Sequence, residues 1–209
     1  MAALPRDHLG RFPLSFNDVS FPDVSFADVS FADASFADGS APPAASVAPT
    51  EAELLDFARR AASDPEFLAR LPLDPVGRTW VRLEGPGGSE AWLIGWPPGA
   101  ETGWHDHGGS RGAFATAAGE LAEESVSVPL PTAGWQSLEL TDDVDRTRRL
   151  PVGRGRAFGP YHVHQVVNAS EEEHAVSVHV YYPPLPMIRR YSRHGRVLRL
   201  ALVERPQEW

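Results

Sequence analysis

The sequence of 209 residues contains eight histidines, and five of them stand in three short windows. These are His105 with His107, His162 with His164, and His179. Residues i and i+2 of a strand point to the same face, so each pair can present two imidazoles together. Three neutral imidazoles would hold a metal ion and leave coordination positions open, as in catalytic sites. The spacing predicts a three-histidine metal site; the alternative is a polar loop with unrelated core or surface histidines.

A second polar pattern surrounds His179. Ser177, His179 and Tyr181 are residues i, i+2 and i+4 of the run AVSVHVYY, so a single strand would place all three on one face. A polar row facing the interior of a barrel indicates a lined pocket. The alternative is a hydrogen-bonded ladder that only fixes the strand register.

The composition excludes several classes of function. The sequence has no cysteine, which excludes disulfides, thiolate metal ligands and a cysteine nucleophile. The formal net charge of −9 argues against nucleic acid or an anionic membrane surface as partner. No apolar run is long enough to span a bilayer, and the first residues do not resemble a signal peptide. We therefore expect a cytoplasmic protein, with a monomer favoured.

The elements that must position these residues are mainly short strands. Between about residues 76 and 202, β-rich segments alternate with turn signals such as PGG, PPG and TAG, which predicts an antiparallel jelly-roll barrel. Upstream, Thr50 and Glu53 match a capping box, and Asp64-Pro65 is typical of a second helix start. We expect these two short helices to pack at the entrance of the barrel.

The first 49 residues differ from the rest in composition. Five-residue SFxDx repeats run from Ser15 to Ser40 and are followed by a Pro/Ala-rich stretch. Residues 1–49 are therefore predicted to be an acidic, disordered tail, and residues 50–209 a single domain. A pentapeptide-repeat coil, or a tail that binds a partner, is the alternative.

Three segments resemble the cysteine dioxygenase (thiol dioxygenase) family of the cupin superfamily in its bacterial form. They are GWHDHGGSRGAFATAAGEL, GPYHVHQVVN and AVSVHVYYPPL, and the resemblance spans about residues 78–193. Many cupins carry a fourth, carboxylate ligand where this sequence has Gly112, so the departure suggests a three-histidine site. Animal members of the family cross-link a cysteine at this position to the active-site tyrosine, which this cysteine-free sequence cannot do.

The resemblance implies one Fe(II) per chain, held by His105, His107 and His164. His162 competes for the third place, but only His164 keeps the family's three-residue spacing to Asn168. His162 is then expected at the pocket mouth or behind a ligand.

The same resemblance assigns catalytic roles to Ser177, His179 and Tyr181, with Tyr181 donating a hydrogen bond to substrate or oxygen. The family binds the substrate carboxylate with an arginine on a strand before the HDH loop. Arg82 is the best match for this arginine, with Arg78 as the alternative.

The function implied is oxidation of cysteine by O₂ to cysteine sulfinate, catalysed by a non-haem iron oxidoreductase. The partners would be a small thiol and O₂, without nucleic acid or membrane. Another small thiol such as 3-mercaptopropionate is an alternative substrate. A non-catalytic cupin that binds a metal or small ligand is an alternative function.

Overall fold

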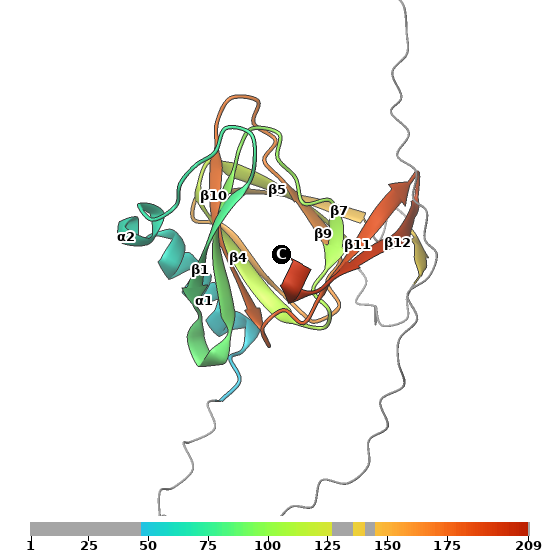
Figure 1. Ribbon diagram of the computed structural model, residues 1–209, viewed down its shortest axis with the longest axis horizontal. Coiled ribbons are helices and arrows are strands. Elements are labelled where there is room, and N and C mark those ends of the chain that lie inside the picture. The colour runs from blue at the N-terminus through green and yellow to red at the C-terminus, as the bar shows by residue number, and fades with distance from the viewer. Residues whose placement is uncertain (1–46, 127–135, 141–144, 209) are drawn as a thin grey trace, which may run out of the picture. The chain divides into compact units, whose positions relative to one another are not determined.

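The structure, a computed structural model, describes residues 47–126, 136–140 and 145–208 and is built mainly of strands (Figure 1). Two α-helices come first, α1 (Glu51–Ala62) and α2 (Pro65–Leu68). The remaining elements are β1 (Thr79–Glu84), η1 (Pro86–Gly88), β2 (Glu90–Trp96), β3 (Trp104–Asp106), β4 (Arg111–Ala118), β5 (Glu120–Val126), β6 (Ser137–Glu139), β7 (Asp145–Pro151), β8 (Gly155–Phe158), β9 (His164–Val167), β10 (Ala175–Tyr182), β11 (Ile188–His194), β12 (Val197–Glu204) and η2 (Pro206–Glu208).

No helix in the described ranges has the length and apolar character needed to cross a membrane. The repeat segment of the predicted tail lies outside the described residues. The division into a tail of residues 1–49 and a domain of residues 50–209 stays a prediction.

The strands form two antiparallel sheets that curl toward each other (Figure 1). One has the order β1-β2-β10-β4-β8, and the other has the order β6-β12-β11-β3-β9-β5-β7. Neighbours such as β2 with β10, or β3 with β9, are far apart in the sequence. Such crossovers between two sheets are typical of a jelly roll. The predicted mainly β, jelly-roll fold is confirmed.

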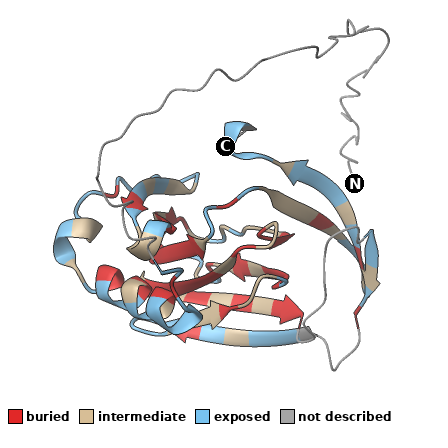
Figure 2. Cartoon of the chain, turned by 90° about the horizontal axis from the view of Figure 1, so that it is seen from below, coloured by how far each residue is buried: buried red, intermediate tan, exposed pale blue. Residues whose placement is uncertain are grey.

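Helix α1 packs on the outer face of the five-stranded sheet, and the expected position at the barrel entrance is wrong. The predicted capping box is present, because Thr50 and Glu53 each accept the other's backbone N–H. The buried contact between the helix and the sheet includes Leu54, Ala58, Ala61, Val178 and Val180. Both the helix stripe and the outer sheet face are apolar, so packing them together removes both from water. Figure 2 shows this burial along α1 and the strands above it.

Strand β10 separates its side chains between two environments. Val178 and Val180 belong to the core under α1, whereas Tyr181 belongs to an interior cluster with Trp96 and Phe114. The ring of His179 stacks on Phe114, with 4.9 Å between ring centroids. The predicted alternation along AVSVHVYY therefore holds, and it directs the polar row into the barrel.

Two strands lack the sequence features that predict a strand. The arginine-rich run DRTRRLP of β7 has no clear alternation, and GRAF of β8 is short. The run HVHQVVN was expected to be extended from its first residue, but β9 begins at His164. Before it the chain turns, and the backbone N–H of His162 donates to the carbonyl of Gly159.

Candidate metal centre and its cavity

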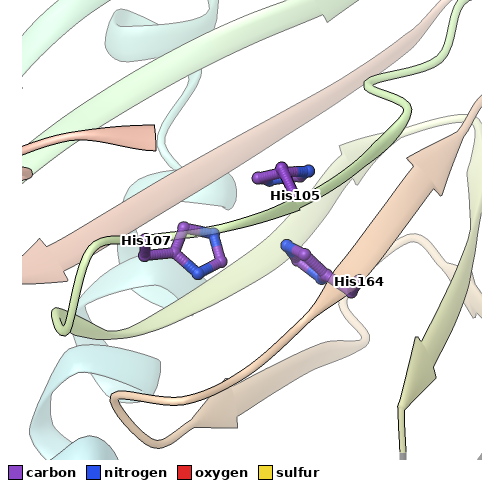
Figure 3. Close-up of side chains that lie close together, drawn as sticks. All are labelled: His105, His107 and His164. Carbon is purple, nitrogen blue, oxygen red and sulfur yellow. The ribbon is translucent and has the colours of Figure 1, made fainter. Parts of the chain in front are cut away.

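Three buried histidines converge inside the barrel (Figure 3). His105 lies in β3, His107 follows this strand directly, and His164 is the first residue of β9. Strands β3 and β9 are paired with His105 opposite His164. One ring nitrogen from each of the three residues lies within 4.8 Å of the others. This distance is compatible with a single metal ion bound to all three rings.

The hydrogen bonds around the rings show which nitrogens are available. Nδ1 of His105 lies 3.0 Å from the carbonyl oxygen of Gly103, which can only accept, so Nδ1 carries the proton and Nε2 is bare. Both ring nitrogens of His107 are buried without a hydrogen-bond partner among the described residues. A buried polar nitrogen without a partner is costly, and a metal ion would satisfy it. The donor set therefore fits a divalent transition metal.

Burial keeps the two histidines of the HDH motif neutral. It lowers the pKa of His105 and of His107 well below the usual value, and the neighbouring His164 lowers both further. Neutral imidazole is the form that binds a metal, so these rings need not lose a proton first at neutral pH.

Asp106 fixes the short strand between His105 and His107. Its buried carboxylate accepts hydrogen bonds from Nε of Arg189 at 3.0 Å, from the hydroxyl of Tyr191 at 2.5 Å and from the backbone N–H of Gly108 at 2.9 Å. These contacts lie on the opposite side of β3 from the histidines. Asp106 was not identified from the sequence as a site residue, although its position between two ligands implies that it faces away from them.

The predicted polar row is connected by hydrogen bonds. The indole N–H of Trp96 donates to Oγ of Ser177 at 2.8 Å. Nε2 of His179 lies 2.9 Å from Oγ of Ser177, and Nδ1 lies 3.2 Å from the hydroxyl of Tyr181. Burial lowers the pKa of His179 to about 3 and raises the pKa of Tyr181. At neutral pH the row therefore consists of a neutral imidazole and a protonated phenol. The ring of Tyr181 stacks on that of His107, with 5.1 Å between centroids.

One cavity joins the metal centre to this row. It has a volume of about 370 Å³ and a largely apolar wall. Its lining includes His105, His164, His179, Tyr181, Trp80, Trp92, Trp96, Arg78, Arg190 and Glu204. Arg190 is already engaged, because its Nε lies 2.7 Å from a carboxylate oxygen of Glu204. A cavity of this kind, with few convergent polar groups, is typical of a small-molecule site.

The structure places the two candidate arginines differently. The guanidinium of Arg78 lies over the ring of Trp96 at 5.4 Å, at the wall of the cavity. Arg82 is not among the cavity-lining residues; its side chain is 67% exposed, and it lies 3.7 Å from Glu90. Its head group instead lies over Trp92 at 5.7 Å. Strand β1 is the edge strand of its sheet, which leaves the Arg82 side chain accessible to water.

Gly112 explains the absence of a fourth ligand. It lies opposite Tyr181 of β10 on one side and Phe158 of β8 on the other. A Cβ atom at this position would come within 2.7 Å of the ring of Phe158. It would also come within 2.8 Å of the carbonyl oxygen of Val180, so a side chain fits there only if both the ring and the backbone shift.

His162 is buried but does not line the cavity. Its Nε2 lies 2.9 Å from Oε1 of Glu123, and the same oxygen lies 2.9 Å from Nδ1 of His164. Glu123 was not identified from the sequence as a site residue. The sequence feature that could have identified it is its position on β5. Burial alternates along this strand, and Glu123 stands at a buried position between the buried residues Leu121 and Ser125.

Comparison with known proteins gives one family and several distant structures. The family model described as Cysteine dioxygenase type I matches residues 38–194. No curated protein matches the chain. An oxalate oxidase in complex with the substrate analogue glycolate is 18% identical, with a TM-score of 0.39 over 52% of each chain. The protein TT1209 from Thermus thermophilus is 19% identical, with a TM-score of 0.43 over 56% of this chain and 94% of that one. The chain thus spans about half the length of the oxalate oxidase that it matches.

Proposed function

This chain belongs to the cysteine dioxygenase type I family, and on that premise we propose that it is a non-haem iron thiol dioxygenase that converts cysteine and O₂ to cysteine sulfinate. The observation that carries the proposal is the cavity where His105 and His164 meet His179 and Tyr181. A site that only stores a metal has no use for the polar row beside it.

The proposed metal is one Fe(II) per chain, held by His105, His107 and His164. When bound, iron supplies the redox chemistry that couples a thiol to O₂, and three neutral ligands leave positions open for both. The protein holds the ligands in place: β3 pairs with β9, and Asp106 fixes the turn after β3. The orphaned nitrogens of His107 support this assignment.

Arg78 is the proposed binding group for the substrate carboxylate, in place of Arg82. None of the ion pairs among the described residues includes Arg78. Burial, followed by the charge of Arg190, lowers the pKa of Arg78, and the opposing effects of Tyr181 and Glu204 offset this only in part. A substrate carboxylate in the cavity would supply a compensating negative charge and could bind the guanidinium group through two parallel hydrogen bonds.

Tyr181 is the proposed hydrogen-bond donor to the reacting groups. Oγ of Ser177 accepts from Trp96 and can donate its own hydrogen to Nε2 of His179. Nδ1–H of His179 then donates to the oxygen of Tyr181, which leaves the phenolic hydrogen free for the cavity. This chain of donors orients the phenol without requiring any charged group.

The experiment that tests this function is oxygen uptake after anaerobic loading with Fe(II). Cysteine, 3-mercaptopropionate and cysteamine are compared at equal concentration, and the sulfinate product is identified by mass spectrometry. Cysteine should be the preferred substrate. A clear preference for 3-mercaptopropionate would keep the activity and change the substrate. Absence of oxygen consumption with every thiol, in protein shown to contain iron, would overturn the proposal.

A further inference from the structure

Glu123 is a charged residue in the interior of the barrel. Its side chain is fully buried on β5, and both carboxylate oxygens are engaged. Oε1 lies 2.9 Å from His162 and 2.9 Å from His164. Oε2 lies 2.5 Å from a guanidinium nitrogen of Arg156 and 3.8 Å from one of Arg148. The carboxylate therefore joins two histidines to two arginines.

The direction of these hydrogen bonds shows which nitrogen of each imidazole carries a proton. A carboxylate only accepts, so Nδ1 of His164 and Nε2 of His162 must both donate. Nδ1 of His164 therefore carries a proton, and Nε2 is the nitrogen of this ring that remains available to a metal. Nε2 is the nitrogen that a metal between the three histidines would need, because Nδ1 is occupied by Glu123.

The charge of Glu123 is compensated inside the cluster. Burial alone would raise the pKa of Glu123, but the hydrogen bonds from His162 and His164 and the charge of Arg156 bring it well below the usual value. Guanidinium nitrogens of Arg156 and Arg148 lie 2.5 and 3.8 Å from Oε2 and balance the negative charge. An ionised acceptor gives stronger hydrogen bonds than a neutral one.

Glu123, His162 and His164 could in principle form a metal site of their own, because their ligand atoms also lie within 4.8 Å of one another. The two guanidinium groups argue against a cation there. Arg156 is in direct contact with Glu123, and Arg148 is close to it. Both imidazole nitrogens that face the carboxylate already donate to it. The cluster is complete as a hydrogen-bonded unit, whereas His107 has no hydrogen-bond partner among the described residues.

We propose that Glu123 is a positioning residue, which fixes the tautomer and ring orientation of His164 for metal binding, with His162 and Arg156 holding the carboxylate in place. The inference deepens the proposed function and rests on the same three-histidine centre. It assigns a task to two buried residues, Glu123 and His162, and to the partly buried Arg156, none of which the catalytic scheme uses. Carboxylates that hold a ligating histidine from behind contribute about 10- to 100-fold to metal affinity.

The test measures metal affinity in the full chain without any turnover. Metal-free protein is titrated with Co(II), whose visible absorption reports the coordination of the ion. Glu123→Gln is compared with Glu124→Gln, its neighbour on the same strand. Glu124 is 34% exposed and contacts Gln165 and Arg193 instead of the histidines. Glu123→Gln should weaken Co(II) binding by about 10- to 100-fold, and Glu124→Gln should leave it unchanged.

Circular dichroism and the melting temperature establish that each variant is folded. A folded Glu123→Gln protein that binds Co(II) within threefold of the original would overturn the proposal. If Glu123→Gln and His162→Ala abolish binding while His105→Ala does not, the metal lies in the alternative set and the proposal is also wrong.

A second measurement needs no variant of Glu123 and decides the matter if Glu123→Gln fails to fold. Two-bond ¹H–¹⁵N correlation spectra of ¹⁵N-histidine-labelled protein report the tautomer of each ring, and His164→Ala assigns the His164 signals. His164 should carry its proton on Nδ1 in the metal-free protein. A proton on Nε2, or on both nitrogens at neutral pH, would overturn the inference. Neither measurement depends on thiol oxidation, so failure of the proposed function would be recognised separately.

Discussion

The indole nitrogen of Trp96 lies 2.8 Å from the hydroxyl oxygen of Ser177, and both residues are fully buried. Trp96 lies on β2 and Ser177 on the adjacent β10, so this bond crosses from one strand to the next. Since an indole N–H only donates, Ser177 accepts this bond, and its own hydrogen remains available to Nε2 of His179. The orientation of the Ser177 hydroxyl thus depends on a residue outside the row.

Trp96→Phe should therefore impair turnover without removing the metal. The buried hydroxyl of Ser177 loses its donor and can reorient, and leaving a buried polar group without a partner costs about 1–3 kcal/mol. We expect kcat for cysteine to fall about tenfold, with iron content unchanged. Steady-state oxygen uptake and metal analysis check both values. An unaltered kcat in folded, iron-loaded protein would show that the orientation of Ser177 has no part in the reaction.

Replacing the two histidines of the HVH segment should separate their roles. His164→Ala removes a proposed metal ligand and leaves Glu123 without one of its donors, so iron binding and activity should be lost. His162→Ala removes only the other donor, and metal content should stay nearly complete. Metal analysis of both proteins after anaerobic loading measures this difference. The reverse pattern would make His162 the third ligand.

Arg78 and Arg82 should differ in their effect on cysteine oxidation. Arg78→Ala would remove a partly desolvated contact to the carboxylate, worth about 2–5 kcal/mol by comparison with truncated buried ion pairs. We expect kcat/KM for cysteine to fall about 30-fold or more. Arg82→Ala should change it little, because that side chain is exposed and pairs with Glu90.

Cysteamine, which lacks the carboxylate, is the control for this comparison. Its slow oxidation should be the same with Arg78 or alanine at this position. An equal loss on both thiols would instead indicate that Arg78 supports the fold. A large loss with Arg82→Ala and none with Arg78→Ala would return the carboxylate site to the residue expected from the sequence.

The metal-free protein should lose stability at a higher pH than the pH at which ordinary carboxylates bind protons. Burial lowers the pKa of His162 to about 4 and that of His179 to about 3, and it lowers those of His105 and His107 as well. The unfolded chain binds these protons near pH 6.5, whereas the folded chain does not. The contribution of these histidines to the free energy of unfolding is therefore fully present above about pH 6.5. It is lost as the pH falls toward their pKa values in the folded chain.

Urea unfolding with a chelator at pH 7, 6 and 5 measures this effect as a falling free energy of unfolding. His194→Gln, which replaces an exposed histidine at the end of β11, should give the same dependence of the unfolding free energy on pH as the original chain. A free energy that stays constant between pH 7 and 5 would contradict the prediction.

The sequence predicts the parts of this site that follow from strand periodicity. His105 and His107 share a face because they stand two apart, and the same rule brings Ser177, His179 and Tyr181 together. It cannot predict which arginine enters the cavity. Arg78 and Arg82 lie on the same face of one chain segment, and their depth depends on the register of the β1–β2 hairpin.

The sequence patterns also do not identify Glu123 and Asp106 as residues of the site. Each is an acidic residue whose partners come from other strands: Arg156 and His164 for Glu123, and Arg189 for Asp106. A pattern along one strand shows that a charge faces inward. It does not show what compensates that charge, because the partners depend on which strands become neighbours.

The cavity is divided between the two sheets in an unequal way. The three histidines come from β3, its following residue and β9, all of the seven-stranded sheet, whereas Ser177, His179 and Tyr181 belong to the five-stranded sheet. Under the proposed function, the residues that hold the metal and the residues that align the substrate therefore belong to different sheets. If one sheet shifts against the other, the distance between a metal at the three histidines and the phenol of Tyr181 changes, although the histidines still coordinate the metal. Substitutions that loosen the packing between the sheets should therefore give a protein that is fully loaded with metal but has a low turnover rate.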